Sequence, residues 1–227
     1  KVVSKYNYKQ YTRTVDQGKR VYLDGKIKLP SVTTILSKTK KDSDGLKKWR
    51  ERVGEAEAQR IMKEAADRGS QMHELIERYV HTQKFDTPAH DAPIAHKMAN
   101  LIISKGFIYL DEVWGIEQNI IYPGEYAGTI DCVGLYKNQP TILDFKQTNK
   151  PKREEWVEDY YLQLTAHEKQ YGEIKKGNIL MASVGLNFQE FEISGSKLDE
   201  YKEKWWQRVE EFKTNHAQPR QESLQKV

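Results

Sequence analysis

Two short apolar segments joined by a turn constrain the fold of this 227-residue chain most strongly. Residues 129–136 and 141–146 are rich in β-branched and aromatic residues, which favour strands. The sequence between them, Lys-Asn-Gln-Pro at 137–140, is typical of a turn. The two segments therefore predict an antiparallel hairpin. Counting outward from the middle of the turn places Asp131 opposite Asp144.

The charged residues of this hairpin indicate a metal site. Opposed side chains in an antiparallel pair have Cβ atoms roughly 4.5–5.5 Å apart, so two facing carboxylates repel each other unless a cation lies between them. Lys146 shares the face of Asp144, because side chains alternate along a strand. A divalent metal is the simplest compensating cation, so we interpret Asp131, Asp144 and Lys146 as catalytic residues of a metal-dependent hydrolase. The alternative is that these groups are ordinary solvated surface charges.

Composition limits the classes of protein that the chain can represent. With 37% hydrophobic and 31% charged residues, it can form one full core. No apolar run approaches the ~20 residues of a membrane-spanning helix, so we expect no membrane partner. The net charge of +4 permits a nucleic-acid partner without requiring one. Basic residues are concentrated in 38–60 and 146–153, which suits a polyanionic substrate beside acidic metal ligands.

The presence of only one cysteine and the absence of a P-loop motif exclude several kinds of metal, disulfide and nucleotide site. One cysteine, Cys132, cannot form an internal disulfide, a four-cysteine iron–sulfur cluster or a zinc finger. We expect it to be a buried, inert thiol that faces away from Asp131. The sequence has no Gly-x-x-x-x-Gly-Lys-Ser/Thr loop, so we expect no ATP-dependent activity. The sequence begins with Lys1 rather than Met, which is compatible with a native N-terminus upstream of this residue.

Periodicity and capping residues predict the remaining elements. Helices are predicted at 30–36, from about 45 to 62, and at 67–79, 94–105, 154–171 and 196–213. Gly106 is expected to end the fourth helix because glycine tolerates a positive φ, and Gly172 the fifth. Further strands are predicted at 112–121, 178–184 and 188–193, and a small hairpin or irregular arm within residues 1–30.

This order predicts an α/β fold. Its centre is a mixed sheet of about five strands flanked by helices, with an N-terminal helical extension. We expect a single domain over residues 1–227. Residues 1–66 form the arm and the extension, 67–213 the core with its closing helix, and 214–227 a frayed polar tail.

Several short motifs occur in an order that resembles the PD-(D/E)XK nucleases, which have the restriction-endonuclease-like fold. The motifs are Gly128-x-x-Asp131, Asp144-Phe-Lys146 and Gln163, and a narrower resemblance also uses Pro30-Ser-Val-Thr33, Trp49 and Gly69-x-x-x-His73. The histidine before the sheet is similar to that of the RecB-type exonucleases. More narrowly, the motifs over about residues 28–185 resemble the mitochondrial genome maintenance exonucleases and their phage-encoded relatives.

The resemblance implies hydrolysis of phosphodiester bonds in DNA with Mg²⁺ or Mn²⁺ as cofactor. Its metal ligands would be His73, Asp131, Asp144 and the carbonyl oxygen of Phe145. Carboxylate and carbonyl oxygens suit these hard cations, and imidazole tolerates Mn²⁺ better than Mg²⁺. A lone histidine on a helix can equally be a hydrogen-bonded core or surface residue.

Five residues are candidates for substrate contact. They are Ser31, Trp49, Arg52, Arg68 and Gln163. Tryptophan among basic residues is typical of stacking on single-stranded bases, although it is also common in helix packing.

Two acidic residues are candidates for supporting roles, and two positions depart from the family pattern. Glu77 lies one helical turn after His73, and Glu117 lies on the strand before the hairpin with an unresolved face. His167 stands where the RecB-type pattern carries tyrosine, and Gln147 where threonine is usual. Both departures concern substrate positioning more than metal binding.

The leading hypothesis is a metal-dependent DNA exonuclease that prefers single-stranded ends and acts in replication, repair or recombination of the phage or bacterial type. The alternatives are a double-strand-processing recombination exonuclease, a structure-specific endonuclease, and a DNA-binding module without catalysis. We expect the cytoplasm of a bacterial host as its compartment, with the mitochondrial matrix as the alternative. The sequence predicts no particular protein partner.

Overall fold

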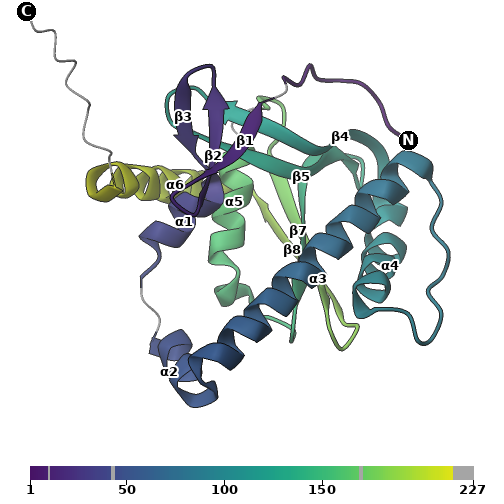
Figure 1. Cartoon of the computed structure of the whole chain (residues 1–227). Coiled ribbons are helices and arrows are strands. Elements are labelled where there is room, and N and C mark those ends of the chain that lie inside the picture. Colours follow the sequence, from purple (N-terminus) through teal and green to yellow (C-terminus); the bar gives the residue numbers. More distant parts are fainter. Residues whose placement is uncertain (10, 42–43, 169–170, 217–227) are drawn as a thin grey trace, which may run out of the picture.

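A five-stranded mixed sheet forms the centre of the protein (Figure 1), whose computed structural model describes residues 1–9, 11–41, 44–168 and 171–216. The strands lie in chain order and are β4 (Leu110–Tyr122), β5 (Tyr126–Tyr136), β6 (Gln139–Thr148), β7 (Lys176–Ser183) and β8 (Phe188–Ser194). All neighbouring strands are antiparallel except β6 and β7, which are parallel. The predicted mixed α/β sheet is therefore confirmed.

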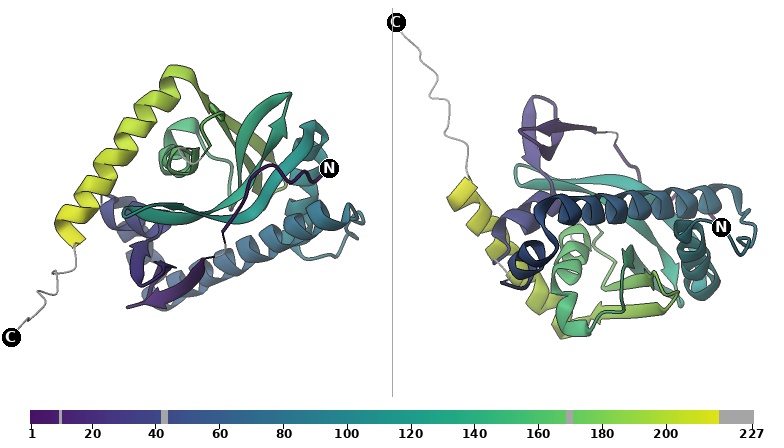
Figure 2. Two further views of the ribbon diagram at one scale, coloured as in Figure 1. Left: turned by 90° about the horizontal axis from the view of Figure 1, so that it is seen from above. Right: turned by 60° about the horizontal axis from the view of Figure 1, so that its bottom comes forward.

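Helices cover both faces of this sheet, as Figure 2 shows. The helices are α3 (Glu55–Thr82) and α4 (Ile94–Gly106) on one face, and α5 (Glu158–Glu168) and α6 (Gly195–His216) on the other. On the first face Met72 and Met98 pack against Phe145, and on the second Leu164 and Leu198 belong to the same core as Ile179. Because both faces are covered, every residue of β7 is buried.

A smaller antiparallel sheet precedes the core. It consists of β1 (Thr12–Asp16), β2 (Lys19–Asp24) and β3 (Ile27–Pro30), and helices α1 (Val32–Thr39) and α2 (Asp44–Val53) follow it. The hairpin or arm expected in residues 1–30 is thus a three-stranded sheet. Helix α1 begins where the side chain of Ser31 accepts a hydrogen bond from the backbone N–H of Thr34 (3.0 Å).

The β5–β6 hairpin has the predicted register. Cys132 pairs with Leu143, and the same register continues to the turn. The turn itself is shorter than predicted, because only Lys137 and Asn138 lie in it, with φ of 49° and 62°. Two consecutive positive φ values give the tight turn whose twist matches the strands. Residues 139–140, expected in the turn, belong to β6.

The boundary predicted between the helices at 45–62 and 67–79 is wrong. The chain instead breaks at Gly54, whose φ is 88°, and helix α3 then continues for 28 residues. The expected division between extension and core at residues 66 and 67 therefore lies inside a continuous helix.

Two other predicted helix ends differ from the structure. Gly106 has a φ of −101°, so it does not end α4 through a left-handed conformation. Its small size suits the packing instead, because a Cβ there would lie 2.7 Å from Cδ1 of Leu180 and the buried leucine would have to shift. The helix predicted at 154–171 begins only at Glu158, after the 3₁₀ turn Glu154–Trp156.

The C-terminal region is helical for longer than expected. Residues 214–216, assigned to a frayed tail, belong to α6, and residues 217–227 lie outside the described part of the chain. No helix of the described ranges has both the length and the apolar character needed to cross a bilayer.

Candidate metal centre and active site

Three acidic residues lie in one row across strands β4, β5 and β6. The pairs Ile116–Cys132 and Gln118–Ile130 flank Glu117 and place it opposite Asp131. The register of the next hairpin places Asp131 in line with Asp144, one step beyond the last pair of its ladder. The face of Glu117, unresolved in the sequence, is thereby defined.

The β5–β6 ladder opens where the acidic row crosses it. The paired residues end with Cys132 and Leu143, and the backbone N–H of Phe145 donates instead to Oδ2 of Asp131 (2.7 Å). Strand β6 remains held from its other side, where Asp144 pairs with Ile179 of β7. The opening leaves one oxygen of Asp131 and the carbonyl of Phe145 accessible to a side chain from α3.

That side chain is His73, which contacts three of the other candidate ligands. Its Nδ1 lies 3.2 Å from Oε1 of Glu117 and 3.6 Å from Oδ1 of Asp131, and its Nε2 lies 2.8 Å from the carbonyl oxygen of Phe145. Both ring nitrogens thus face oxygen atoms that act as acceptors when the carboxylates are ionised, an arrangement that favours the doubly protonated imidazole. Burial alone would lower the pKa of His73, but Asp131 and Glu117 raise it to about 9.

Potential ligand atoms of His73, Glu117 and Asp131 all lie within 4.8 Å of one another. This cluster has the donors that a Mn²⁺ or Mg²⁺ ion prefers, with oxygens in the majority. A metal ion binds only the neutral imidazole, so its binding would displace the second proton of His73. The sequence prediction named His73 and Asp131 as ligands but treated Glu117 only as a supporting residue.

Asp144 lies beside this cluster and lacks a full set of partners. It is 3% exposed, and its Oδ2 has no hydrogen bond, although Nζ of Lys146 lies 3.2 Å away without hydrogen-bond geometry. Burial raises the pKa of Asp144 to about 7, with Asp131 adding to the effect and Lys146 opposing it. A buried carboxylate oxygen in this state fits a site that is completed by a cation.

Lys146 is held by contacts on three sides. Its Nζ donates to Oε1 of Gln163 (2.9 Å), pairs with Asp144 and lies 4.8 Å from the ring centre of Tyr160. Burial alone would lower the pKa of Lys146, but Asp144 and Asp131 more than compensate and raise it. The amine is therefore a fixed, protonated donor beside the carboxylates.

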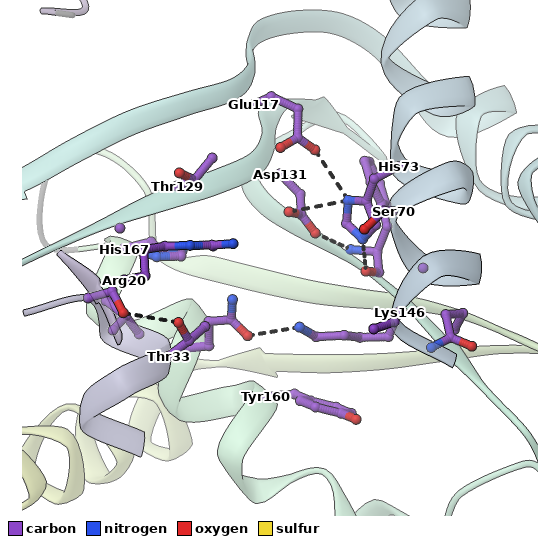
Figure 3. Close-up of a pocket in the computed structure, with 18 of the residues that line it drawn as sticks. Arg20, Thr33, Ser70, His73, Glu117, Thr129, Asp131, Lys146, Tyr160 and His167 are labelled. Atoms are coloured by element: carbon purple, nitrogen blue, oxygen red, sulfur yellow. Dashed lines mark hydrogen bonds and ion pairs between the residues drawn. The ribbon is translucent and has the colours of Figure 1, made fainter. Parts of the chain in front are cut away.

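These groups open into a cavity of about 580 Å³ (Figure 3). Its walls come from α3, β4, β5, β6, α5, α1 and the small N-terminal sheet. Charged or polar residues that line it include His73, Glu77, Glu117, Asp131, Lys146, Gln163, His167, Arg13 and Arg20. Such a polar cavity suits a charged substrate better than an apolar ligand.

His167 lies on the side of the cavity between Thr129 and Arg20, as Figure 3 shows. It is 3% exposed, and its Nε2 has no hydrogen-bond partner among the described residues. Burial lowers the pKa of this imidazole to about 4, so the ring is neutral at pH 7. A Cβ on Gly128 would lie 2.7 Å from this nitrogen, so His167 packs directly on the backbone of β5.

Three of the other predicted residues also line the cavity. Gln163 is engaged with Lys146, and the hydroxyl of Ser31 caps α1. Glu77 lies on the wall, with its Oε1 3.9 Å from Nε2 of His81. None of these contacts tests a role in substrate binding.

The remaining substrate candidates do not line this cavity. Arg68 connects α3 to the end of β6, because it donates to the side chains of Gln147 (2.9 Å) and Asn149 (2.6 Å). Trp49 and Arg52 lie on α2, which stands at the lower end of α3 in Figure 1. Their predicted contact with nucleic acid therefore stays a prediction.

Sequence reasoning did not assign Arg13, Arg20 or Tyr160 to the cavity, and it noted His167 only as a departure from the family pattern that concerns substrate positioning. Tyr160 and His167 lie three residues before and four residues after Gln163, so helical spacing could have revealed both. Nothing in the local sequence placed the two arginines there.

Comparison with known proteins gives a distant relation to an exonuclease. The chain is 27% identical over 131 residues to "Mitochondrial genome maintenance exonuclease 1" of Mus musculus, a match that covers 55% of this chain and 38% of the mouse protein. The chain thus spans well under half of that relative. No protein-family model matches. The solved structure "Crystal structure of SSO0001" has a TM-score of 0.40 and 11% identity, covering 83% of this chain and 86% of that one, which supports no assignment.

Proposed function

We propose that the protein is a metal-dependent deoxyribonuclease that removes nucleotides from DNA ends and prefers single strands. The observation that carries this proposal is the cluster of His73, Glu117 and Asp131 in an open polar cavity, with the amine of Lys146 on the same lining and buried Asp144 paired to that amine. The distant relation to an exonuclease supports the same reaction class. The motif pattern supports assignment to the RecB-type branch of the PD-(D/E)XK nucleases.

The cation would be held by His73, Glu117, Asp131, Asp144 and the Phe145 carbonyl. When bound, it would polarise a phosphoryl oxygen and acidify the attacking water. Oxygen ligands suit both Mg²⁺ and Mn²⁺, and the imidazole favours Mn²⁺.

Lys146 supplies the chain's own contribution to the chemistry. As a fixed ammonium, it donates hydrogen bonds to the attacking water and to a non-bridging oxygen of the scissile phosphate, which stabilises the charge that develops there. Gln163 holds the amine in place through its side-chain oxygen. Because the amine is already oriented, little reorganisation is needed when the substrate binds.

The preference for single-stranded ends and a place in phage- or bacterial-type replication, repair or recombination are parts of this proposal. A bacterial cytoplasm is the proposed compartment. A recombination exonuclease acting on double strands and a structure-specific endonuclease use the same chemistry and differ in the DNA that they accept.

End-labelled linear oligonucleotides and a circular single strand, each incubated with Mg²⁺, Mn²⁺ or EDTA, test this function. We expect mononucleotide or short-oligonucleotide release from linear single strands with Mn²⁺ or Mg²⁺, none with EDTA, and an intact circle. Cutting of the circle would favour an endonuclease, and faster digestion of duplex ends would favour the double-strand exonuclease. If the protein binds DNA but hydrolyses none of it with any metal, the protein is a DNA-binding module without catalytic activity.

A further inference from the structure

One face of the small N-terminal sheet (β1 to β3) lines the cavity. Arg13 pairs with Tyr22 across β1 and β2, and Arg20 lies two residues before Tyr22 on β2, so the three side chains share a face. Tyr22 is 1% exposed, and its hydroxyl lies 2.8 Å from Oγ1 of Thr129 on β5. This contact fixes the sheet against the strand that carries Asp131.

The two arginines on this face have no partner among the residues that the structure describes. No hydrogen bond or ion pair joins either guanidinium to a described residue, and both side chains are exposed at the cavity. Other arginines of the described chain do form pairs, such as Arg60 with Glu57 and Arg208 with Asp159. The carboxylates that line the cavity have other partners. Glu117 and Asp131 contact His73, Glu77 lies near His81, and Glu74 pairs with Arg78.

The spacing of the two guanidinium groups suits a chain of anions. Diagonal neighbours across an antiparallel pair are roughly 7–8 Å apart, so Arg13 and Arg20 can each contact a different phosphate of one strand. A guanidinium matches the geometry of a phosphate with two parallel hydrogen bonds. A polyanion lying between this wall and the metal centre would contact the two guanidinium groups on one side and a bound cation on the other.

An independent observation also indicates a ligand at this wall. Nε2 of His167 is buried without a partner and lies on the lining of the same cavity, near Arg20 in Figure 3. Buried polar atoms are nearly always satisfied, so an exception at a cavity wall marks a place for a hydrogen-bonding ligand.

We propose that the Arg13–Arg20 face of the N-terminal sheet binds the sugar–phosphate backbone of the DNA strand next to the phosphate being cut. The proposal rests on the proposed function, because it takes DNA as the ligand. Each guanidinium contacts one phosphate, and the contact is independent of base sequence.

Binding of a fluorescein-labelled oligothymidylate, measured by anisotropy in EDTA over a series of salt concentrations, tests this proposal without hydrolysis. For single strands the slope of log affinity against log salt changes by about 0.7 for each lost phosphate contact. The double variant Arg13→Ala/Arg20→Ala should therefore lose about 1.4 from this slope and bind about tenfold or more weakly at low salt. Arg13→Lys/Arg20→Lys should restore most of the slope, because the charges are kept.

The opposite face of the same sheet provides a matched control. Lys19 and Lys28 lie on that face, since Lys28 pairs with Leu23 and Lys19 lies four residues before Leu23 on β2. The double variant Lys19→Ala/Lys28→Ala removes the same charge and should keep the wild-type slope. Circular dichroism melting shows whether each variant is folded.

Equal loss in the Lys19/Lys28 control, or an unchanged slope in the arginine variant, would overturn the proposal. Failure of the proposed function has a different signature. If the wild-type protein binds DNA through the arginines but releases no nucleotide with any metal, the binding face stands and the nuclease assignment fails. If the wild-type protein digests DNA and the arginine variant binds DNA normally, the nuclease assignment stands and only the proposed role of the Arg13–Arg20 face is wrong.

Discussion

Lys146 is the residue on which the chemistry of the site depends most. It is a protonated donor held by Gln163 and Asp144, and it is not needed as a metal ligand. Lys146→Ala should therefore lower kcat by about a hundredfold or more while Mn²⁺ binding is retained. Single-turnover digestion and calorimetric titration of Mn²⁺ measure the two effects separately.

Gln163→Ala serves as the comparison for that experiment. It removes the support of the amine and keeps the amine itself, so we expect a smaller loss of rate than for Lys146→Ala. If Lys146→Ala digests DNA at the wild-type rate with the same Mn²⁺ dependence, the lysine has no part in the reaction.

His167 should make folding stability depend on pH between about 4 and 6.5. Its pKa is about 4 in the folded protein and 6.5 in the unfolded chain, so only the unfolded chain binds the proton within this window. The contribution of His167 is fully present above pH 6.5 and is lost as the pH falls towards 4, up to about 3 kcal/mol.

The measurement for His167 is urea unfolding of the wild type and of His167→Gln at several pH values. Asp144, whose pKa is about 7, contributes the opposite trend, so the difference between the two proteins isolates the histidine. The wild type should lose more stability than His167→Gln on acidification. Parallel curves would show that His167 does not titrate in this way.

Single residues of the site were predictable where counting along strands was sufficient. The hairpin register placed Asp131 and Asp144 in line, and the same counting about Gly124 would have placed Glu117 opposite Asp131. Arg13 and Arg20 could not be assigned, because the small sheet that carries them is positioned by tertiary contacts, among them those of Tyr22 and Leu29.

At the level of elements, the packing of α5 against β5 depends on the absence of a side chain at Gly128. A Cβ there would lie 2.7 Å from Nε2 of His167 and 3.2 Å from Cγ2 of Val32. Gly128→Ala should therefore reduce the free energy of unfolding by about 1–3 kcal/mol, because buried rings cannot move aside freely.

A double-mutant cycle tests the origin of that effect. Adding His167→Ala removes the closest contact, so the cost of Gly128→Ala should fall by about 1 kcal/mol in this background. Denaturant unfolding of the four proteins gives the coupling energy. An equal cost in both backgrounds would mean that the glycine is required for another reason.

Helices and strands with an apolar stripe were predicted well from the sequence. The solvent-exposed part of a helix was not predicted. The part of α3 around residues 63–66 has no such stripe, and its exposed surface carries the ion pairs Arg60–Glu64 and Lys63–Asp67. Pairs at this spacing support a helix that packs little against the core. The end of α4 was predicted at the correct position but for the wrong reason, since Gly106 has a negative φ and its small size instead accommodates Leu180.

On the scale of the whole molecule, the candidate ligands come from one helix and from three consecutive strands that follow it at a distance in the sequence. His73 lies on α3, and Glu117, Asp131 and Asp144 lie on β4, β5 and β6. The predicted mixed sheet brings the three strands together, but the approach of α3 depends on packing that local sequence does not encode. A cation bound at this junction should stabilise the entire fold, because unfolding separates all its ligands.

Thermal unfolding with and without Mn²⁺ measures that stabilisation. Free Mn²⁺ at about a hundred times its Kd adds about 2.7 kcal/mol, which for a chain of this size raises Tm by roughly 5–10 °C. Asp131→Asn/Glu117→Gln should abolish the shift, and Lys19→Ala should keep it. A full shift in the carboxylate variant would place the bound metal elsewhere.

Anomalous diffraction from crystals grown with Mn²⁺ tests most directly whether the acidic row and His73 share a cation. We expect a strong anomalous peak within coordinating distance of Asp131 and Asp144, with the imidazole of His73 turned towards it, and loss of that peak in Asp131→Asn. A site without a peak at saturating Mn²⁺, or a peak bound only by surface carboxylates outside the cavity, would contradict the proposed metal centre.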